Sequence, residues 1–181
     1  DVESAEEPVP FPLSEPGPYY TGKRTFTFED ASRDGREIRV TVFYPALRPE
    51  GSTGPKLLAG TNREPDLSGA PYPLILTGSD TGDQLFKAHL ATHGLVMAIV
   101  RVPNTFDCVY RWFVDHPRDY LVVLDQIASK PLEGLEAVID SDHVGATGYS
   151  GDGIISLALS GVRIDPEFYL SYCEQAPPME P

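Results

Sequence analysis

The chain has 181 residues, of which 41% are hydrophobic, enough for the core of one globular domain. Its 14 Lys and Arg residues against 27 Asp and Glu residues give a net charge of −13, which argues against nucleic acid or an anionic membrane as a partner. No stretch reaches the roughly 18 apolar residues that a membrane span needs.

The two ends of the chain lack the regular patterns of its middle. Residues 1–18 are rich in Glu and Pro without an apolar period, which predicts a flexible leader. Residues 175–181 contain three prolines and are expected to be a linker or a cut end. A start without Met and without a signal peptide is typical of a processed exported protein, so we expect an extracellular or periplasmic location, with the cytoplasm left open.

The first regular pattern is a predicted β-hairpin. Residues 24–29 and 37–44 alternate polar and apolar side chains, and residues 32–35 supply the turn. Nearly continuous apolar runs at 72–77 and 95–100 then predict strands that are buried on both faces. The irregular stretch between the hairpin and these strands, 51–70, predicts a surface loop.

Helical patterns alternate with these strands. Apolar spacing predicts a helix over 83–92 that ends before Gly94, and a second helix over 117–128 with a proline in its first turn. Residues 144–147 predict a further strand and 154–159 an apolar helix behind it. The order β-β-β-α-β-α-β-α predicts an α/β fold, with a mostly parallel sheet flanked by helices.

The turn between the last strand and the last helix carries the clearest chemical signal. Ser150 stands between small residues, with Gly148 and Gly153 relieving the crowding of a sharp strand-to-helix turn, as in a nucleophile elbow. The following helix directs free N–H groups toward the serine. Asp152 stands where G-x-S-x-G has its second glycine. The alternative is an ordinary strand-to-helix turn with Ser150 as the N-cap.

In this order the segments resemble the α/β-hydrolase superfamily, and within it the bacterial esterases grouped with dienelactone hydrolases and platelet-activating-factor acetylhydrolases. Each segment alone is weakly specific, but five of them occur in the order of the family. The resemblance extends from about residue 18 to residue 172 and is carried by residues 32–36 with 40–45, 73–76 with 78–82, 89–94, 118–119 with 123–126, and 144–150.

The resemblance implies roles for individual residues. Ser150 matches the nucleophile, and the backbone N–H of Gly151 matches the oxyanion-hole donor that follows it. The second donor would come from the loop after the third strand, where many relatives have His-Gly. Here Ser79-Asp80 takes that place, so the donor is assigned only to the backbone of Ser79, Asp80 or Thr81.

Aromatic side chains are expected around the serine. Tyr110, Trp112 and Phe113 lie before the third helix, in a loop at the mouth of the site if the family architecture holds, and with Tyr149 they are expected to line a pocket for the substrate. An equally good interpretation is that the cluster at 110–113 packs the loop onto the core or against a missing part of the protein.

The acid and histidine of the triad are not found after the elbow. In the family both follow the nucleophile, whereas every histidine here precedes Ser150 in a segment that matches a structural part: His89, His93, His116 and His143. We expect structural roles for these four histidines. A general base is defined by its proximity to the serine in space rather than in sequence, so a catalytic role for one of them stays open. The acids soon after the elbow helix are Asp165, Glu167 and Glu174.

The sheet is also expected to be incomplete. The family places the elbow strand inside a larger sheet, but the chain supplies about five strands, which would leave residues 144–147 at an open edge. We therefore expect residues 19–174 to be the N-terminal portion of a single α/β-hydrolase domain. A second chain or a C-terminal part would supply the missing strands, acid and histidine.

The remaining candidates for chemistry are sparse. Cys108 and Cys173 are compatible with one disulfide in an oxidising compartment or with two buried thiols. His89 and His93 have helical i, i+4 spacing but no third ligand nearby, so no metal is expected. No glycine-rich nucleotide loop occurs, and no cofactor is expected.

Three functional hypotheses remain. The first is a serine hydrolase that cleaves carboxylic esters through an acyl-enzyme on Ser150, acting on small-molecule or polymeric substrates. The second is a noncatalytic relative that uses the same fold as a binding or interaction module. The third is a metal-assisted or thiol hydrolase. The sequence does not distinguish ester from thioester, lactone or amide as the substrate.

Overall fold

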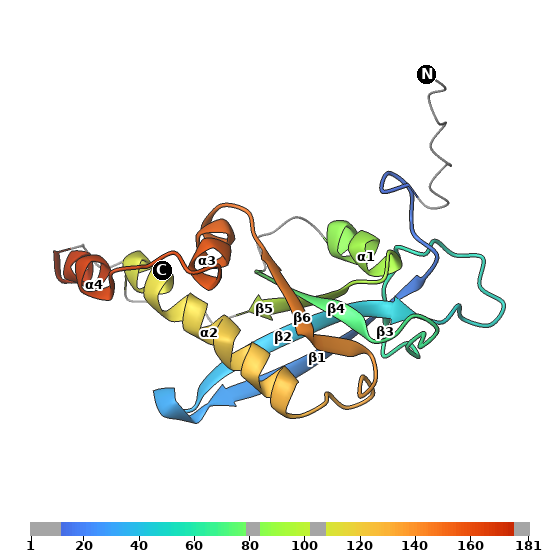
Figure 1. The fold of residues 1–181 in the computed structure, drawn as a ribbon, viewed down its shortest axis with the longest axis horizontal. Helices are drawn as coiled ribbons and strands as arrows, with labels where there is room; N and C mark the ends of the chain where they lie inside the picture. The colour runs from blue at the N-terminus through green and yellow to red at the C-terminus, as the bar shows by residue number, and fades with distance from the viewer. Residues whose placement is uncertain (1–11, 79–83, 102–107, 176–181) are drawn as a thin grey trace, which may run out of the picture.

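The computed structural model describes residues 12–78, 84–101 and 108–175. Within them a six-stranded mixed sheet, with strand order β3-β1-β2-β5-β4-β6, has helices on both faces (Figure 1). The α/β class expected from the sequence is therefore confirmed. The elements are β1 Tyr20–Asp30, η1 Ala31–Arg33, β2 Arg36–Ala46, β3 Gly60–Thr61, β4 Tyr72–Gly78, α1 Gln84–Thr92, β5 Val96–Arg101, α2 Val109–Ser129, β6 Ile139–Thr147, α3 Gly151–Leu159 and α4 Pro166–Gln175.

The predicted hairpin is confirmed, with longer strands than expected. β1 and β2 are antiparallel from the Tyr20–Ala46 pair to the Asp30–Arg36 pair. The turn is held by the Asp30 carboxylate, which accepts a hydrogen bond of 2.9 Å from the backbone N–H of Ser32. Two successive left-handed residues, Asp34 at φ 53° and Gly35 at φ 70°, then reverse the chain.

The strands predicted at 72–77 and 95–100 correspond to β4 and β5, which are parallel to each other. Alternate residues of β5 enter two separate cores because successive strand side chains point to opposite faces. Val96, Ala98 and Val100 pack in the core that α2 covers, whereas Met97 and Ile99 pack in the smaller core under α1. Burial on both faces explains the continuous apolar runs.

The start of α2 differs from the prediction. The sequence placed Pro117 in the first turn of a helix, but α2 begins at Val109 and Pro117 lies inside it. Proline costs an internal helix a hydrogen bond and crowds the preceding turn. The earlier turns persist because their aromatic side chains pack against α4, with ring centroids of Phe113 and Tyr169 separated by 5.4 Å.

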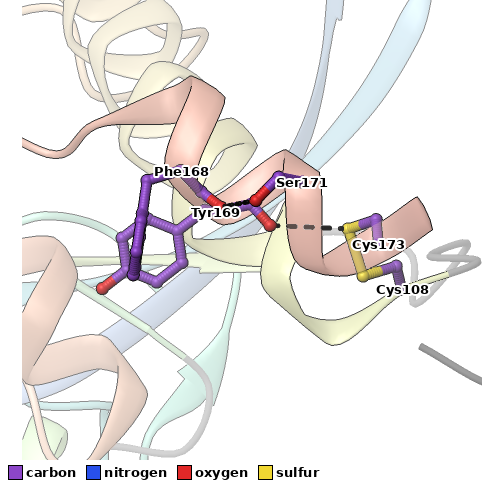
Figure 2. Close-up of a disulfide and its surroundings, with 5 residues drawn as sticks. All are labelled: Cys108, Phe168, Tyr169, Ser171 and Cys173. Carbon is purple, nitrogen blue, oxygen red and sulfur yellow. Dashed lines mark hydrogen bonds between the residues drawn. A yellow bond between two sulfur atoms is a disulfide. The ribbon is translucent and has the colours of Figure 1, made fainter. Parts of the chain in front are cut away.

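Helix α4 has no counterpart among the predicted elements. Its local signals are present, since Pro166 is its first residue and the Asp165 carboxylate accepts a 3.0 Å hydrogen bond from the N–H of Phe168. A disulfide joins Cys173 in α4 to Cys108, the N-cap residue of α2, with the two Cα atoms 5.4 Å apart (Figure 2). The structure thus selects the disulfide from the two states that the sequence left open.

Strand β6 lies at an edge of the sheet, as predicted. Among the described residues it pairs with β4 alone, and Val144 in its centre is 39% exposed. The helices that follow it also carry large exposed apolar side chains, including Leu157 of α3 and Phe168 of α4. The chain from β6 onward therefore combines an open strand edge with exposed apolar side chains on the helices that follow.

Candidate active site

Ser150 occupies the sharp turn between β6 and α3. Its backbone has φ 56° and ψ −122°, outside the right-handed and extended regions that non-glycine residues ordinarily adopt. The position corresponds to the N-cap of α3, yet the side chain makes no capping hydrogen bond. An N-cap serine normally has an extended backbone and accepts from the first turn, so the N-cap alternative does not account for this geometry.

Close packing around the turn explains its glycines. A Cβ on Gly148 would lie 2.1 Å from the backbone carbonyl carbon and oxygen of Asp152, so a side chain there collides with the first turn of α3. A Cβ on Gly78, the last residue of β4, would lie 1.9 Å from the Asp152 carboxylate. Asp152 is only 5% exposed, and its negative charge lies at the positive end of α3.

Among the described residues, nothing forms a hydrogen bond with the serine hydroxyl or with the N–H after it. Within the described part of the chain, neither Ser150 Oγ nor the Gly151 N–H has a hydrogen-bonding partner, and Ser150 is exposed. A hydroxyl beside a free helical N–H is the arrangement that acyl transfer requires. The candidates for a second oxyanion donor, Ser79, Asp80 and Thr81, lie outside the described residues.

The aromatic residues divide into two groups. Trp112 approaches the elbow, because a Cβ on Gly151 would lie 2.4 Å from its ring. Tyr110 and Phe113 instead pack on α4, with ring centroids 5.1 Å from Tyr172 and 5.4 Å from Tyr169. All three are in the first turns of α2 rather than in the loop that the sequence predicted.

Tyr149 is 71% exposed immediately before the serine. Two of the four residues predicted to line a substrate pocket are therefore close to Ser150. Tyr149 precedes it in the chain, and Trp112 lies against Gly151, the residue after it. The other two serve the contact between α2 and α4.

Three of the four histidines have local structural partners away from Ser150. His89 and His93, on and just after α1, bind the backbone oxygens of Leu13 and Glu15 at 2.7 and 2.9 Å. The Nδ1 atom of His143 makes a hydrogen bond of 2.7 Å with the Asp140 carboxylate. It lies in β6 four residues before Thr147, so roughly 13 Å of strand separates it from the strand's end.

His116 is the one buried histidine of the described chain. Its ring lies against that of Trp112, with the centroids 4.4 Å apart and the planes tilted by 45°. Burial, together with the positive charges of Arg36 and Arg33, lowers the pKa of His116 to about 3. Both guanidinium groups are held close to this ring by the fully buried carboxylate of Asp119, at 2.9 Å from Arg36 and 2.6 Å from Arg33.

A general base for Ser150 is thus not provided by the described histidines. A base that accepts a serine proton must be able to become cationic, which two neighbouring guanidinium groups oppose at His116. Neither cysteine is a free thiol, and the described residues contain no group of three or more His, Cys, Asp or Glu side chains arranged for a metal ion. The structure also has no helix, among those described, that is long and apolar enough to cross a membrane.

Comparison with known proteins gives a similarity in structure rather than in sequence. No family model matches the chain, and no curated protein matches it. Among solved structures, a ferulic acid esterase from Streptomyces cinnamoneus superposes with a TM-score of 0.60 at 19% sequence identity. The match covers 82% of this chain and 57% of the esterase, so the chain spans little more than half of that enzyme.

At this level of identity the similarity concerns the fold. The chain has an esterase-like α/β fold. The narrower dienelactone hydrolase grouping has no support from the comparisons.

Proposed function

We propose that the chain is the nucleophile-bearing part of a serine hydrolase that cleaves carboxylic esters. The observation that carries the proposal is the backbone of Ser150, at φ 56° and ψ −122° between an edge strand and a helix. Strained non-glycine conformations are retained mainly at functional sites, because the surrounding packing must hold them in place. Here the packing of Gly148 and Gly78 against Asp152 supplies that constraint.

The proposed reaction follows from the groups at the turn. Ser150 Oγ attacks the ester carbonyl carbon while a histidine takes its proton, and the tetrahedral oxyanion accepts a hydrogen bond from the Gly151 N–H. The C–O bond then breaks, and the alcohol leaves with the proton from the histidine. Water, activated by the same histidine, releases the acid and restores the serine. A second oxyanion donor would come from the backbone of Ser79, Asp80 or Thr81.

The histidine and its acid partner are proposed to come from a C-terminal part of the protein or from a second chain. The edge position of β6 and the exposed apolar side chains of α3 and α4 support this, because another strand and its helix would cover them. The ferulic acid esterase is also longer, since the match covers 57% of it. In this view residues 19–174 are one portion of a single domain, between the leader 1–18 and the segment 175–181.

Two features suggest a substrate class and a location. Trp112 and Tyr149 flank the serine with flat apolar surface, which favours esters with an aromatic or extended acyl group. The Cys108–Cys173 disulfide favours an oxidising compartment, and hence an extracellular or periplasmic protein.

The second candidate is a noncatalytic α/β-hydrolase relative that acts as a binding module. It is favoured by one observation, the separate structural partners of the described histidines. Without a base, Ser150 would remain a weakly nucleophilic hydroxyl.

A fluorophosphonate probe separates the two candidates. The protein is expressed from its intact gene, treated with the probe, and analysed by intact mass and peptide mapping. We expect one adduct on Ser150, its loss in Ser150→Ala, and hydrolysis of an aryl ester reduced by roughly 10⁴-fold or more in that variant. Ser160→Ala, which alters an exposed serine at the end of α3, is the matched control and should label normally.

The outcomes have distinct meanings. Absence of an adduct on the intact gene product would refute the esterase and leave the binding module. Labelling of residues 1–181 alone would contradict the proposed origin of the histidine, since no second part would then be needed.

A further inference from the structure

A positively charged pocket lies on the face of the sheet that α1 covers. Its floor consists of alternate residues of three neighbouring strands, which share one face because strand side chains alternate. The antiparallel register places Arg39 of β2 beside Arg101 of β5 and Thr41 beside Ile99, while Thr25 of β1 lies beside Thr41. The cavity measures about 210 Å³.

The pocket gathers cations in a strongly acidic protein. Four of the chain's 14 Lys and Arg residues line it, although the net charge is −13. No Asp or Glu is among its described lining residues, which are Lys23, Thr25, Arg39, Thr41, Phe43, Thr61, Gln84, Lys87, Ile99 and Arg101.

The pairing of Arg39 with Arg101 is unfavourable by itself. Like charges directly opposite each other on neighbouring strands destabilise a sheet. Neither guanidinium forms an ion pair or hydrogen bond within the described residues. Glu37 and Glu29 face each other one row further along the hairpin and do not ion-pair with Arg39. An anion between the two arginines would turn this repulsion into attraction.

The floor of the pocket also carries two hydroxyl groups. The hydroxyls of Thr25 and Thr41 lie 3.3 Å apart on its floor. Lys87 of α1 also lines the pocket and is only 3% exposed. Fork-shaped guanidinium groups with hydroxyl donors match the tetrahedral oxygens of a phosphate or sulfate.

We propose that this pocket is a binding site for a phosphate or sulfate group, either free or on a small molecule. It is smaller than the roughly 300 Å³ or more of sites that enclose drug-sized ligands, so it would hold the anionic group rather than a whole large ligand. The site is separate from Ser150, since α3 packs in the core of the α2 face, whereas the pocket opens on the α1 face. The inference therefore does not depend on the esterase.

Titration calorimetry with inorganic phosphate at constant ionic strength tests the proposal. We expect saturable binding to the protein, weakened at least about tenfold by Arg39→Gln with Arg101→Gln, because each substitution removes charge-assisted hydrogen bonds. The matched control is Arg118→Gln with Arg163→Gln, which removes the same charge from exposed positions outside the pocket and should bind as the unmodified protein does.

A second readout is independent of any ligand. In chloride buffer without phosphate, the Arg39→Gln, Arg101→Gln variant should unfold at a higher temperature than the control variant, because the like-charge pair is gone. Absence of phosphate binding, or equal weakening in both double variants, would overturn the proposal. Phenyl phosphate distinguishes the sources: tighter binding than inorganic phosphate indicates a site for a phosphorylated molecule, and weaker binding a site for the free ion.

Discussion

The elbow geometry makes Gly148 and Gly153 a matched pair for mutation. Both glycines flank Ser150 closely, and neither has a positive φ, so replacement by alanine tests space rather than backbone conformation. A Cβ on Gly148 would lie 2.1 Å from the carbonyl group of Asp152. A Cβ on Gly153 would lie 3.4 Å from the oxygen of Gly148, which is an ordinary contact.

The two substitutions should therefore act in opposite directions. Reaching ordinary contact at Gly148 requires the turn to open by about 1.3 Å, the difference between 2.1 and 3.4 Å, and overpacking of this kind costs roughly 1–3 kcal/mol. Gly153→Ala instead replaces a glycine in the first turn of α3, which gains roughly 0.5–1 kcal/mol. The variants should differ by about 1.5–4 kcal/mol in the free energy of unfolding.

Urea unfolding followed by circular dichroism measures this difference directly. In the protein expressed from its intact gene, Gly148→Ala should also slow fluorophosphonate labelling, because the displaced turn moves Ser150 away from the Gly151 N–H. Gly153→Ala should label at the normal rate. Equal stability of the two variants would refute the argument that close packing at Gly148 shapes the elbow.

Two further predictions concern stability. The disulfide links residues 65 positions apart, so Cys108→Ser with Cys173→Ser should cost roughly 4 kcal/mol by the chain-entropy model, measured by urea unfolding without reductant; an unchanged midpoint would contradict it. For His116 the folded pKa of about 3 lies below the ordinary 6.5, so the neutral form is favoured by folding. The contribution of His116 to the free energy of unfolding is then complete above pH 6.5 and decreases as the pH falls toward 3. At pH 5 the decrease is roughly 2 kcal/mol. His116→Gln should remove that part of the pH dependence, and an identical slope in the variant would argue against the assignment.

The elements that sequence predicts well here are those whose burial is continuous or strictly alternating. β4 and β5 are buried on both faces and read as apolar runs, and the hairpin is fixed by the turn from Asp30 to Gly35. Such patterns reflect local geometry and need no knowledge of distant partners.

The errors occur where distant contacts decide. Pro117 indicates a helix start by local rules, yet α2 continues through it because Phe113 and its neighbours pack on α4, more than fifty residues later. α4 itself has no buried residue and is fastened by aromatic pairs and the disulfide to Cys108. Neither contact can be deduced from local periodicity, although Asp165 and Pro166 mark the start of α4.

For the candidate site, the sequence predicted the sharp turn at Ser150 but not the residues that pack around it. The spacing of Gly148, Ser150 and Gly153 predicts the elbow, and the structure gives Ser150 the unusual backbone that the motif calls for. The sequence placed Trp112 in a loop, whereas Trp112 contacts Gly151 from the first turns of α2. The contact of Asp152 with Gly78 could not be foreseen, because it joins α3 to the end of β4, more than seventy residues earlier in the chain.

These contacts bear on how the proposed enzyme would be assembled. Gly148 and Gly78 leave room for Asp152, Trp112 lies against Gly151, and all of these groups belong to the described chain. A strained residue persists only when its surroundings determine it fully, and here those surroundings are present without any further chain. Under the proposed function, the partner segment would therefore contribute the histidine and its acid to a nucleophile whose backbone is already set. Mutations could then disturb the backbone of Ser150 and the general base independently of each other. Gly148→Ala should disturb the backbone of Ser150 and leave the histidine and its acid unaffected.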